Sequence, residues 1–276
     1  MHSAKHNLPA AGTIIASSFT SPLDPLYLAG IFQPIFTRSY PHHRKVERIT
    51  LLGAILLAFS PPSQTPRDPS KLVTLRQLTT ENPNKIICVF PETTTTNGRG
   101  ILPLCPSLLS ADGSTRIYPV NLRYTPQDVT TPVPGGYASW FWRLLSKPSH
   151  QMRVRIASRV YNSSNQDSPA RQTSITPGGA GPTKATTATG YDTNIFDQPD
   201  FRNGFTGDHA EAGHGMNVQV GGAVNGVDDD EPRSPAEAKV LERVAEDLAR
   251  LGRVKRVGLG VEDKIGFLKV WGSRKR

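Results

Sequence analysis

The sequence predicts an α/β fold, and three observations lead to this expectation. Short apolar segments rich in β-branched residues recur along roughly residues 1–160, as is typical of strands. Segments with a helical spacing of apolar residues alternate with them, and this alternation favours an α/β domain. The chain has 276 residues, enough for one full domain with extensions, because domains usually have ~100–200 residues.

Four segments have the composition of strands. Residues 12–17 and 85–90 are short apolar runs with β-branched residues, and residues 152–157 alternate apolar and basic side chains. This alternation is typical of a half-buried strand. Residues 116–122 form the fourth expected strand, and Pro119 lies inside it. A proline within a strand indicates an edge position or a functional bend.

Four segments of the same region have the features of helices. Residues 26–32 follow a turn that two prolines bracket, and residues 70–81 carry leucines at a three-residue spacing. Residues 44–59 are basic at their start and apolar afterwards, and two prolines follow them. Residues 137–145 are rich in aromatic side chains. Proline stops and apolar spacing together predict a helix in each segment.

The rest of the chain divides into a linker and a C-terminal extension. Residues 163–233 are rich in Gly, Ser, Thr, Asn and Asp, and contain four Lys/Arg and ten Asp/Glu. This composition is typical of a disordered acidic linker. Ser234 and Glu237 then form a capping box ahead of a helix that we expect to pack on the first domain, with a basic tail behind it. We therefore expect domains at 1–162, 163–233 and 234–276.

The charge of the chain is positive and unevenly distributed. Because residues 163–233 carry −6 of the formal charge of +9, the remaining residues carry +15. Such a surface favours phosphates, acidic membranes or nucleic acid as partners. Nucleic acid is the least favoured of these, because the basic residues are not interleaved with aromatics in any recognisable module. Excess Lys and Arg can also serve solubility alone.

Cysteine usage and apolar runs bear on location. Cys88 and Cys105 have no metal-ligand spacing, so we expect no metal site and a reducing, cytosol-facing location. The longest apolar runs, residues 25–36 and 49–59, have about a dozen residues each, whereas a membrane-spanning helix needs ~20. The chain is therefore expected to lie on a membrane surface rather than to span it.

Three features could make this membrane contact. They are the apolar run Leu51 to Phe59, the aromatic cluster Trp140 to Trp142, and the basic surface. For the aromatic cluster, packing in the protein core is the favoured alternative.

A polar turn follows the strand expected at residues 85–90. Residues 89–100 read VFPETTTTNGRG. The hydroxyls of residues 94–96, the Asn97 amide and the Arg99 guanidinium can jointly hydrogen-bond phosphate oxygens, and glycines there let the backbone approach closely. A polar loop around a capped glutamate is the alternative.

This turn resembles the Phe-Pro-Glu-Gly-Thr box of the glycerolipid acyltransferase family, which includes lysophosphatidate and lysophospholipid acyltransferases. FTSPLD at residues 19–24 is similar to the His-x-x-x-x-Asp box of that family, and IYPV at residues 117–120 resembles its Val-Pro-Val-type strand. The resemblance covers roughly residues 10–160 and looks closest to a fungal branch of lipid droplets and the endoplasmic reticulum. It implies a mixed sheet flanked by helices.

The resemblance also implies a function. It is acyl-CoA-dependent O-acylation of lysophosphatidate or a related lysophospholipid in glycerolipid synthesis, at the cytosolic face of the endoplasmic reticulum membrane or of a lipid droplet. Acyl-CoA would be a co-substrate, with no bound cofactor or metal. An anionic membrane surface would be a partner, and the oligomeric state is left open.

Site residues follow from the same resemblance. Asp24 would be catalytic; the phosphate site would consist of Glu92, Thr94, Thr95, Asn97 and Arg99; and Ile117, Pro119 and Val120 would wall the acceptor site. We expect Asp24 and the turn at residues 92–99 to face each other across a cleft large enough for a glycerol head. Alternatively, Asp24 only caps the helix that follows it.

The chain departs from the pattern of the family in three places. Phe19 stands where the family has its general-base histidine, and losing such a base usually costs ~10²–10⁴-fold in rate. A catalytically impaired homologue that binds lipid or acts as a scaffold is therefore the alternative function. Thr93 replaces a glycine, and a φ above zero there would cost ~1–3 kcal/mol. Eleven residues precede the first expected strand, so the N-terminus looks shortened.

Overall fold

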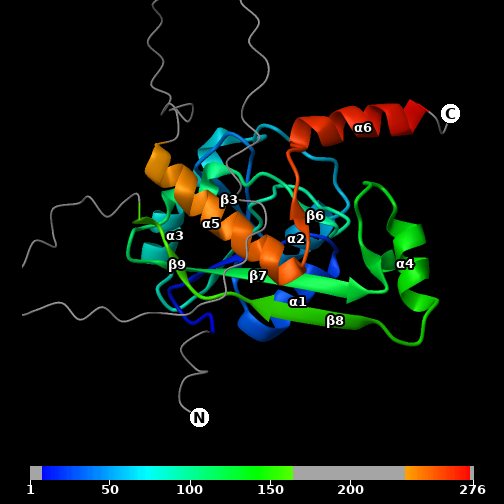
Figure 1. The fold of residues 1–276 in the computed structure, drawn as a ribbon, viewed down its shortest axis with the longest axis horizontal. Coiled ribbons are helices and arrows are strands. Elements are labelled where there is room, and N and C mark those ends of the chain that lie inside the picture. Colours follow the sequence, from blue (N-terminus) through cyan, green and yellow to red (C-terminus); the bar gives the residue numbers. More distant parts are fainter. Residues whose placement is uncertain (1–7, 164–233, 274–276) are drawn as a thin grey trace, which may run out of the picture. The chain divides into compact units, whose positions relative to one another are not determined.

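The chain folds around one mixed β-sheet in the computed structural model, which describes residues 8–163 and 234–273 (Figure 1). The described residues belong to one compact unit. The strand order is β4-β3-β2-β5-β1-β7-β8, and β9 pairs with β7 beyond the end of β8. The strands are β1 (Ile14–Ser17), β2 (Ile35–Arg38), β3 (Val46–Ile49), β4 (Leu72–Val73), β5 (Ile87–Val89), β7 (Arg116–Thr125), β8 (Gln151–Ile156) and β9 (Val160–Tyr161).

The centre of the sheet is parallel and its margins are antiparallel. Strands β2, β5, β1 and β7 run in one direction, whereas β3, β4, β8 and β9 join by antiparallel pairs. The expected α/β fold with a mixed sheet flanked by helices is confirmed.

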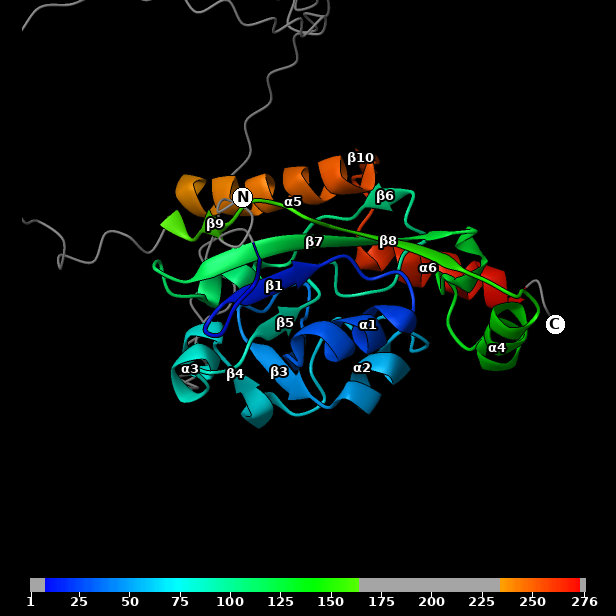
Figure 2. The same ribbon diagram turned by 90° about the horizontal axis from the view of Figure 1, so that it is seen from below.

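Helices cover both faces of the sheet. In Figure 2, α5 (Pro235–Gly252) lies over one face, and α1 (Leu23–Phe32) and α2 (Leu51–Leu57) lie over the other. Ile14 and Ala16 of β1 pack toward the α5 face, and Ile15 packs toward α1 and α2. This is the pattern of a parallel strand that is buried on both sides.

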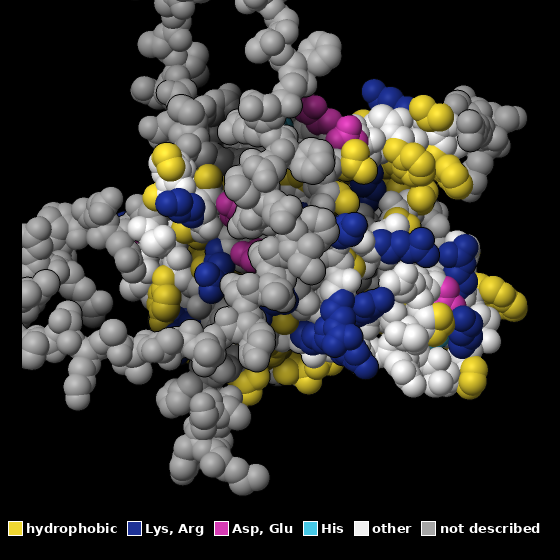
Figure 3. Space-filling view, in the orientation of Figure 1, with side chains coloured by type: hydrophobic (Ala, Val, Ile, Leu, Met, Phe, Trp, Pro, Cys, Tyr) yellow, Lys and Arg dark blue, Asp and Glu magenta, His cyan; other side chains and the backbone are white. Residues whose placement is uncertain are grey.

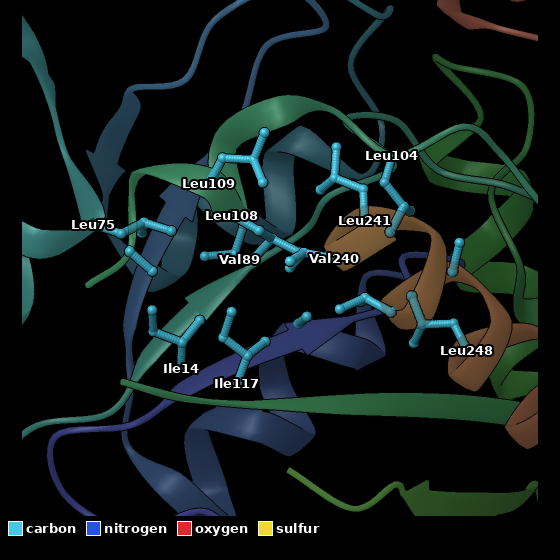
Figure 4. Packing of buried hydrophobic residues seen from close by; sticks show 14 of the residues in the cluster. Ile14, Leu75, Val89, Leu104, Leu108, Leu109, Ile117, Val240, Leu241 and Leu248 are labelled. Atoms are coloured by element: carbon cyan, nitrogen blue, oxygen red, sulfur yellow. The ribbon is translucent and has the colours of Figure 1, made fainter. Parts of the chain in front are cut away.

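The larger core cluster lies beneath α5. Figure 4 shows Ile14, Val89 and Ile117 of the sheet in one cluster with side chains of α5, which also contains Leu108 and Leu109. These two leucines belong to the short helix η3 (Pro106–Ser110). Leu75 and Leu78 of α3 (Leu75–Glu81) close the same cluster. Burial here depends on chain segments far apart in sequence.

The helix expected at residues 44–59 is wrong in its first half. Val46–Ile49 forms strand β3 and pairs with β2, which was itself not expected. The helix α2 starts only after Thr50, whose side chain accepts a hydrogen bond from the Gly53 N–H at 3.1 Å. Val46 is buried, so tertiary pairing decides the structure of this short segment.

Pro119 lies in an interior strand, so the expected edge position is wrong. Strand β7 has β1 on one side and β8 with β9 on the other. On that second side the Pro119 carbonyl accepts a hydrogen bond from Ala157 N–H at 2.9 Å, just where β8 has ended and β9 has not begun. Because the N and O of one strand residue point to the same neighbour, the missing N–H of Pro119 falls in this interruption.

The C-terminal extension packs on the domain as expected. The capping box of Ser234 and Glu237 is present, and one face of α5 is buried against the sheet. Beyond it, β10 (Lys255–Arg256) pairs in parallel with β6 (Gly100–Ile101), and a further helix, α6 (Val261–Ser273), follows. Neither element was expected. All but the first residue of the expected linker lies outside the described residues, so the domain boundaries stay a prediction.

The aromatic helix α4 (Tyr137–Leu145) has the expected bounds, but core packing is wrong for most of its aromatic side chains. Every residue of α4 is at least partly exposed, and Trp142 and Phe141 are 75% and 56% exposed. Trp140 is half-buried, and its indole N–H donates to the Val129 carbonyl at 2.7 Å.

Within residues 8–163 and 234–273, no helix combines the length and the apolar composition that a membrane crossing requires.

Candidate functional site

The candidate site lies at one edge of the sheet, where parallel strands end. Strands β1 and β5 both run parallel and end at Ser17 and Val89, and the two polar turns follow directly. The Thr96 N–H donates to the Phe19 carbonyl at 2.9 Å, and the Thr131 N–H donates to the Thr20 carbonyl at 2.9 Å. The two turns are thereby brought side by side, at the edge where α/β sheets usually bind ligands.

Asp24 is fully buried in the first turn of α1, and both of its oxygens are hydrogen-bonded. Oδ2 accepts from the backbone N–H groups of Thr20 and Ser21 at 2.6 and 2.9 Å, and from the Thr20 hydroxyl at 3.2 Å. Oδ1 accepts from the Tyr124 hydroxyl at 2.6 Å. Burial raises the pKa of Asp24 to about 6, although these hydrogen bonds oppose the rise. The carboxyl orders the turn ahead of α1 rather than capping N–H groups of the helix.

Phe19 belongs to the core rather than to a cavity. Its side chain is fully buried and stacks on Phe90, with ring centroids 4.3 Å apart and planes at 23°. The same apolar cluster contains Leu28 of α1 and Phe36 of β2. A histidine at this position would lie among apolar side chains, which favours its neutral form.

Glu92 is a second buried carboxyl beside Asp24. Its Oε2 accepts from the Leu102 N–H at 3.0 Å. Burial raises the pKa of Glu92 to about 7 and the nearby Asp24 carboxyl adds to the rise, whereas the N–H groups of Leu102 and Phe19 and the Lys264 ammonium lower it. Two carboxyls with raised pKa values are thus held together behind the two turns, a pattern that often marks functional sites.

Thr93 has the left-handed backbone that its alignment with a glycine implied. Its φ is 59°, and Gly98 in the same turn has a φ of 68°. A β-branched residue in this region costs about 1–3 kcal/mol, which the surrounding contacts must offset. The turn therefore keeps a glycine-type conformation without the glycine.

The threonines of the turn are engaged inside the protein. Thr95 Oγ1 donates to the Thr131 carbonyl at 2.6 Å, and Thr94 Oγ1 accepts from the Lys264 ammonium at 2.8 Å. The same ammonium donates to the Thr95 carbonyl at 2.5 Å. Both threonines are buried, so their hydroxyls serve the turn itself.

The other two residues of the expected phosphate site face solvent. Asn97 and Arg99 are exposed, and Asn97 Oδ1 accepts from the Arg99 backbone N–H at 3.0 Å. The five expected residues therefore divide into a buried group that includes Glu92 and an exposed pair. The structure does not join them around one anion-sized pocket.

Lys264 is, with Tyr124, a residue of this site that the sequence did not indicate. It comes from α6, and its ammonium reaches Thr94 and Thr95 across 170 and 169 residues of sequence. Burial lowers the pKa of Lys264 to about 8, although the nearby Glu92 favours its charged form. The basic character of the C-terminal tail was visible, but nothing in it singled out this lysine from its neighbours.

The expected wall residues are part of the sheet core. Ile117 and Val120 are fully buried, and the pairing of β7 with β1 sets Ile117 opposite Ile14 and Pro119 opposite Ala16. The cavity at the site is lined instead by the next residues of β7, 121–124, together with parts of both turns. Strand β7 therefore contributes to this cavity through residues that follow the three expected ones.

This cavity is small. Its volume is about 10 Å³, roughly the space for one water molecule. The expected cleft for a glycerol head is therefore wrong for this conformation. The hydrogen bonds of Thr96 to Phe19 and of Thr95 to Thr131 draw the turns together and explain the closure.

Potential metal ligands do not cluster in the described part of the chain. There, no group of three or more His, Cys, Asp or Glu side chains is placed to hold a metal ion. Cys88 and Cys105 are both buried free thiols.

The sequence of the chain is similar to that of an acyltransferase-like protein over part of its length. The chain is 28% identical over 146 residues to a Schizosaccharomyces pombe protein named "Putative lysophosphatidic acid:oleoyl-CoA acyltransferase". The match covers 53% of this chain and 48% of the relative, so the chain spans about half of that protein. No family model and no solved structure matches the chain. The similarity supports a general acyltransferase role.

Proposed function

We propose that the protein transfers an acyl chain from acyl-CoA to the free hydroxyl of lysophosphatidate or a related lysophospholipid. The observation that carries this proposal is the meeting of residues 19–24 with residues 92–99 at the carboxyl edge of the parallel strands, joined by the Thr96–Phe19 hydrogen bond of 2.9 Å. The name of the fission-yeast relative refers to the same class of substrate. Acyl-CoA is a co-substrate in this proposal, with no bound cofactor or metal.

The reaction moves one proton from the acceptor hydroxyl to a base and then to the leaving thiolate. The acceptor oxygen attacks the thioester carbonyl, a C–O bond forms, the C–S bond breaks, and the hydroxyl proton finally goes to the leaving thiolate. Asp24, with a pKa raised to about 6, is the proposed group that takes this proton, because a base works best when its pKa lies near the operating pH. Thr20 and Tyr124 separate Asp24 from the cavity that they line, so the turns must move apart for substrate to enter.

The proposed location is the cytosolic face of the endoplasmic reticulum or of a lipid droplet. Exposed apolar side chains on α2 and α4 support contact with a membrane surface; they include Leu52 at 63% and Leu145 at 64% exposure. Aromatic and aliphatic side chains of this kind bind the boundary between headgroups and acyl chains. Anionic lipids would add attraction to the basic surface.

A second candidate function is lipid binding without turnover. The specific observation in its favour is that Phe19 occupies the histidine position and packs its ring on Phe90. Both oxygens of Asp24 are in addition held by hydrogen bonds. A site in this condition could bind a lysolipid yet activate its hydroxyl poorly.

One assay separates the two functions. The purified full chain is offered oleoyl-CoA and a panel of lysolipids, and CoA release and acylated product are measured. The variant Asp24→Asn is compared with Asp112→Asn, a change at a partly exposed carboxyl away from the site, and thermal melts check the folding of both. Turnover that only Asp24→Asn abolishes supports acyl transfer. Lysolipid binding without any turnover supports the second function, and the absence of both activities overturns both.

A further inference from the structure

The β7–β8 pair gathers arginine side chains on one face of the sheet. Arg123 of β7 lies directly opposite Arg153 of β8, and Arg155 lies opposite Asn121. Alternate residues of a strand point to the same face, so all three guanidinium groups lie on the face that α5 covers. Arg253, immediately after α5, adds a fourth arginine beside these three.

These arginines line an open cleft, which we call the arginine cleft. Its volume is about 750 Å³, and the remaining lining residues are uncharged. Figure 3 shows Lys and Arg side chains gathered where the end of α5 lies over β7 and β8. Within the described part of the chain, none of the four arginines forms an ion pair with a carboxylate.

The fold itself uses only part of this cationic group. Arg155 Nη1 donates to the Leu251 carbonyl at 2.7 Å, and Arg123 Nη1 donates to the Gly252 carbonyl at 3.2 Å. Cations at the last carbonyls of a helix are stabilising, so these two arginines have a structural role at the end of α5. Arg153 and Arg253 are exposed. The backbone N–H of Arg253 caps the end of α5, but among the described residues neither of the two guanidinium groups makes a bond to a helix end.

The arrangement is unfavourable without a bound anion. Like charges directly opposite each other on neighbouring strands destabilise a sheet, and Arg123 and Arg153 are such a pair. Burial lowers the pKa of Arg155, and the charges of Arg253, Arg153 and Arg123 lower it further. A ligand carrying several negative charges would remove this repulsion.

We propose that the arginine cleft binds the phosphate groups of a soluble phosphate ester, and that this ligand is coenzyme A, through its diphosphate and 3′-phosphate. Guanidinium groups bind phosphate oxygens with two parallel hydrogen bonds, and the volume is that of an ordinary ligand site. Asn121 and Arg123 line both this cleft and the small cavity beside the two turns, so a thioester held here adjoins the candidate site. The choice of coenzyme A among phosphate esters rests on the proposed function.

Calorimetric titration of the full chain with coenzyme A and with pyrophosphate tests the proposal. The variant Arg153→Gln/Arg253→Gln keeps Arg123 and Arg155, whose guanidinium groups bind the last carbonyls of α5. Its control, Arg48→Gln/Arg143→Gln, removes the same charge at exposed sites elsewhere. Because each charge-assisted contact is worth roughly tenfold in affinity, we expect the first variant to bind coenzyme A at least about tenfold more weakly, and the control to stay within about twofold of the unchanged chain.

Two further arms identify the source of the phosphate. Dephospho-coenzyme A, which lacks the 3′-phosphate, is expected to bind more weakly than coenzyme A to the unchanged chain. Vesicles containing phosphatidic acid are expected to bind the double variant and its control equally. An unchanged affinity of the double variant for coenzyme A overturns the proposal, and so does a loss confined to vesicle binding.

The failure of this proposal and the failure of the proposed function can be told apart. Coenzyme A binding that requires Arg153 and Arg253, in a chain without acyl transfer, upholds the arginine cleft and removes the enzymatic assignment. Acyl transfer by a chain whose affinity for coenzyme A does not depend on these arginines upholds the enzymatic assignment and overturns the arginine cleft.

Discussion

The two hollows that meet at Asn121 and Arg123 are opposite in character. The cavity beside the turns measures about 10 Å³ and has buried carboxyls behind it, whereas the arginine cleft measures about 750 Å³ and is lined by exposed cations. In the first, both oxygens of Asp24 and the hydroxyls of Thr94 and Thr95 are hydrogen-bonded to the protein itself. In the second, charge is left without a partner among the described residues. The hydrogen bonds of the closed site fix the positions of its side chains, and the arginines of the open cleft can bind an anionic group.

The largest expected effect is at Phe19, because its ring fills the core behind the closed site. The variant Phe19→His should lose about 3 kcal/mol of unfolding free energy, since it exchanges a buried aromatic ring for a polar group. Urea denaturation at pH 7 measures this, with Phe141→His as the exposed control. If Phe19→His proves as stable as the unchanged chain and gains turnover, the ring does not belong to the core.

The next effect concerns the pH dependence that the buried carboxyls produce. The pKa of Glu92 is about 7 in the folded chain against a usual 4.5, so the folded state holds this proton more tightly. Its contribution to stability is therefore full below about pH 4.5 and is lost as the pH rises through 7. Between pH 5 and 8 the unchanged chain should lose about 2–3 kcal/mol that Glu92→Gln retains.

Denaturant midpoints of both chains at the two pH values measure this difference. Asp24 has a raised pKa as well, so some loss should remain in Glu92→Gln. Identical dependence of stability on pH for the two chains would show that folding does not raise the pKa of Glu92.

A smaller effect is expected from releasing the turn. Lys264→Met removes the ammonium contacts to Thr94 and to the Thr95 carbonyl. The local opening free energy of the turn should fall by about 1–2 kcal/mol, since hydrogen bonds to charged groups contribute about this much. Amide hydrogen exchange of residues 94–98 should therefore quicken by roughly tenfold or more. Lys269→Met, on an exposed position of the same helix, should leave it unchanged.

The smallest expected effect on stability is at Trp142, which is 75% exposed. Trp142→Ala should change the unfolding free energy by no more than about 0.5 kcal/mol, because exposed positions contribute little. Its binding to anionic vesicles should nevertheless weaken, if α4 is a membrane contact. A flotation assay with Arg143→Gln as a charge control distinguishes apolar insertion from attraction alone.

Local signals were sufficient for much of the fold. The capping box predicted the start of α5, and the aromatic-rich segment 137–145 predicted the bounds of α4. The meeting of residues 19–24 with residues 92–99 was expected from the resemblance alone, and the structure explains it by the shared edge of the parallel strands β1 and β5. The segment at Val46 was misjudged, since its pairing with β2 overrode the local pattern.

The chemistry of the site was less accessible. Tyr124 contacts Asp24 across 100 residues of sequence, and Lys264 contacts Thr94 across 170. Contacts between residues so far apart produce no local pattern in the sequence. The alternation of arginines along β8 was visible in the sequence. That these arginines form a cluster could not be predicted, because it depends on the strand register that sets Arg153 opposite Arg123.

The position of α5 late in the sequence has a consequence for biosynthesis. A ribosome completes the sheet strands of residues 14–161 well before it makes α5, β10 and Lys264. Until then the apolar face that receives Val240, Val244 and Leu248 has no cover, and such surfaces invite aggregation of nascent chains. The protein should therefore acquire its protease resistance late, once α5 has been made, and chaperones that hold nascent chains should bind the part that precedes α5.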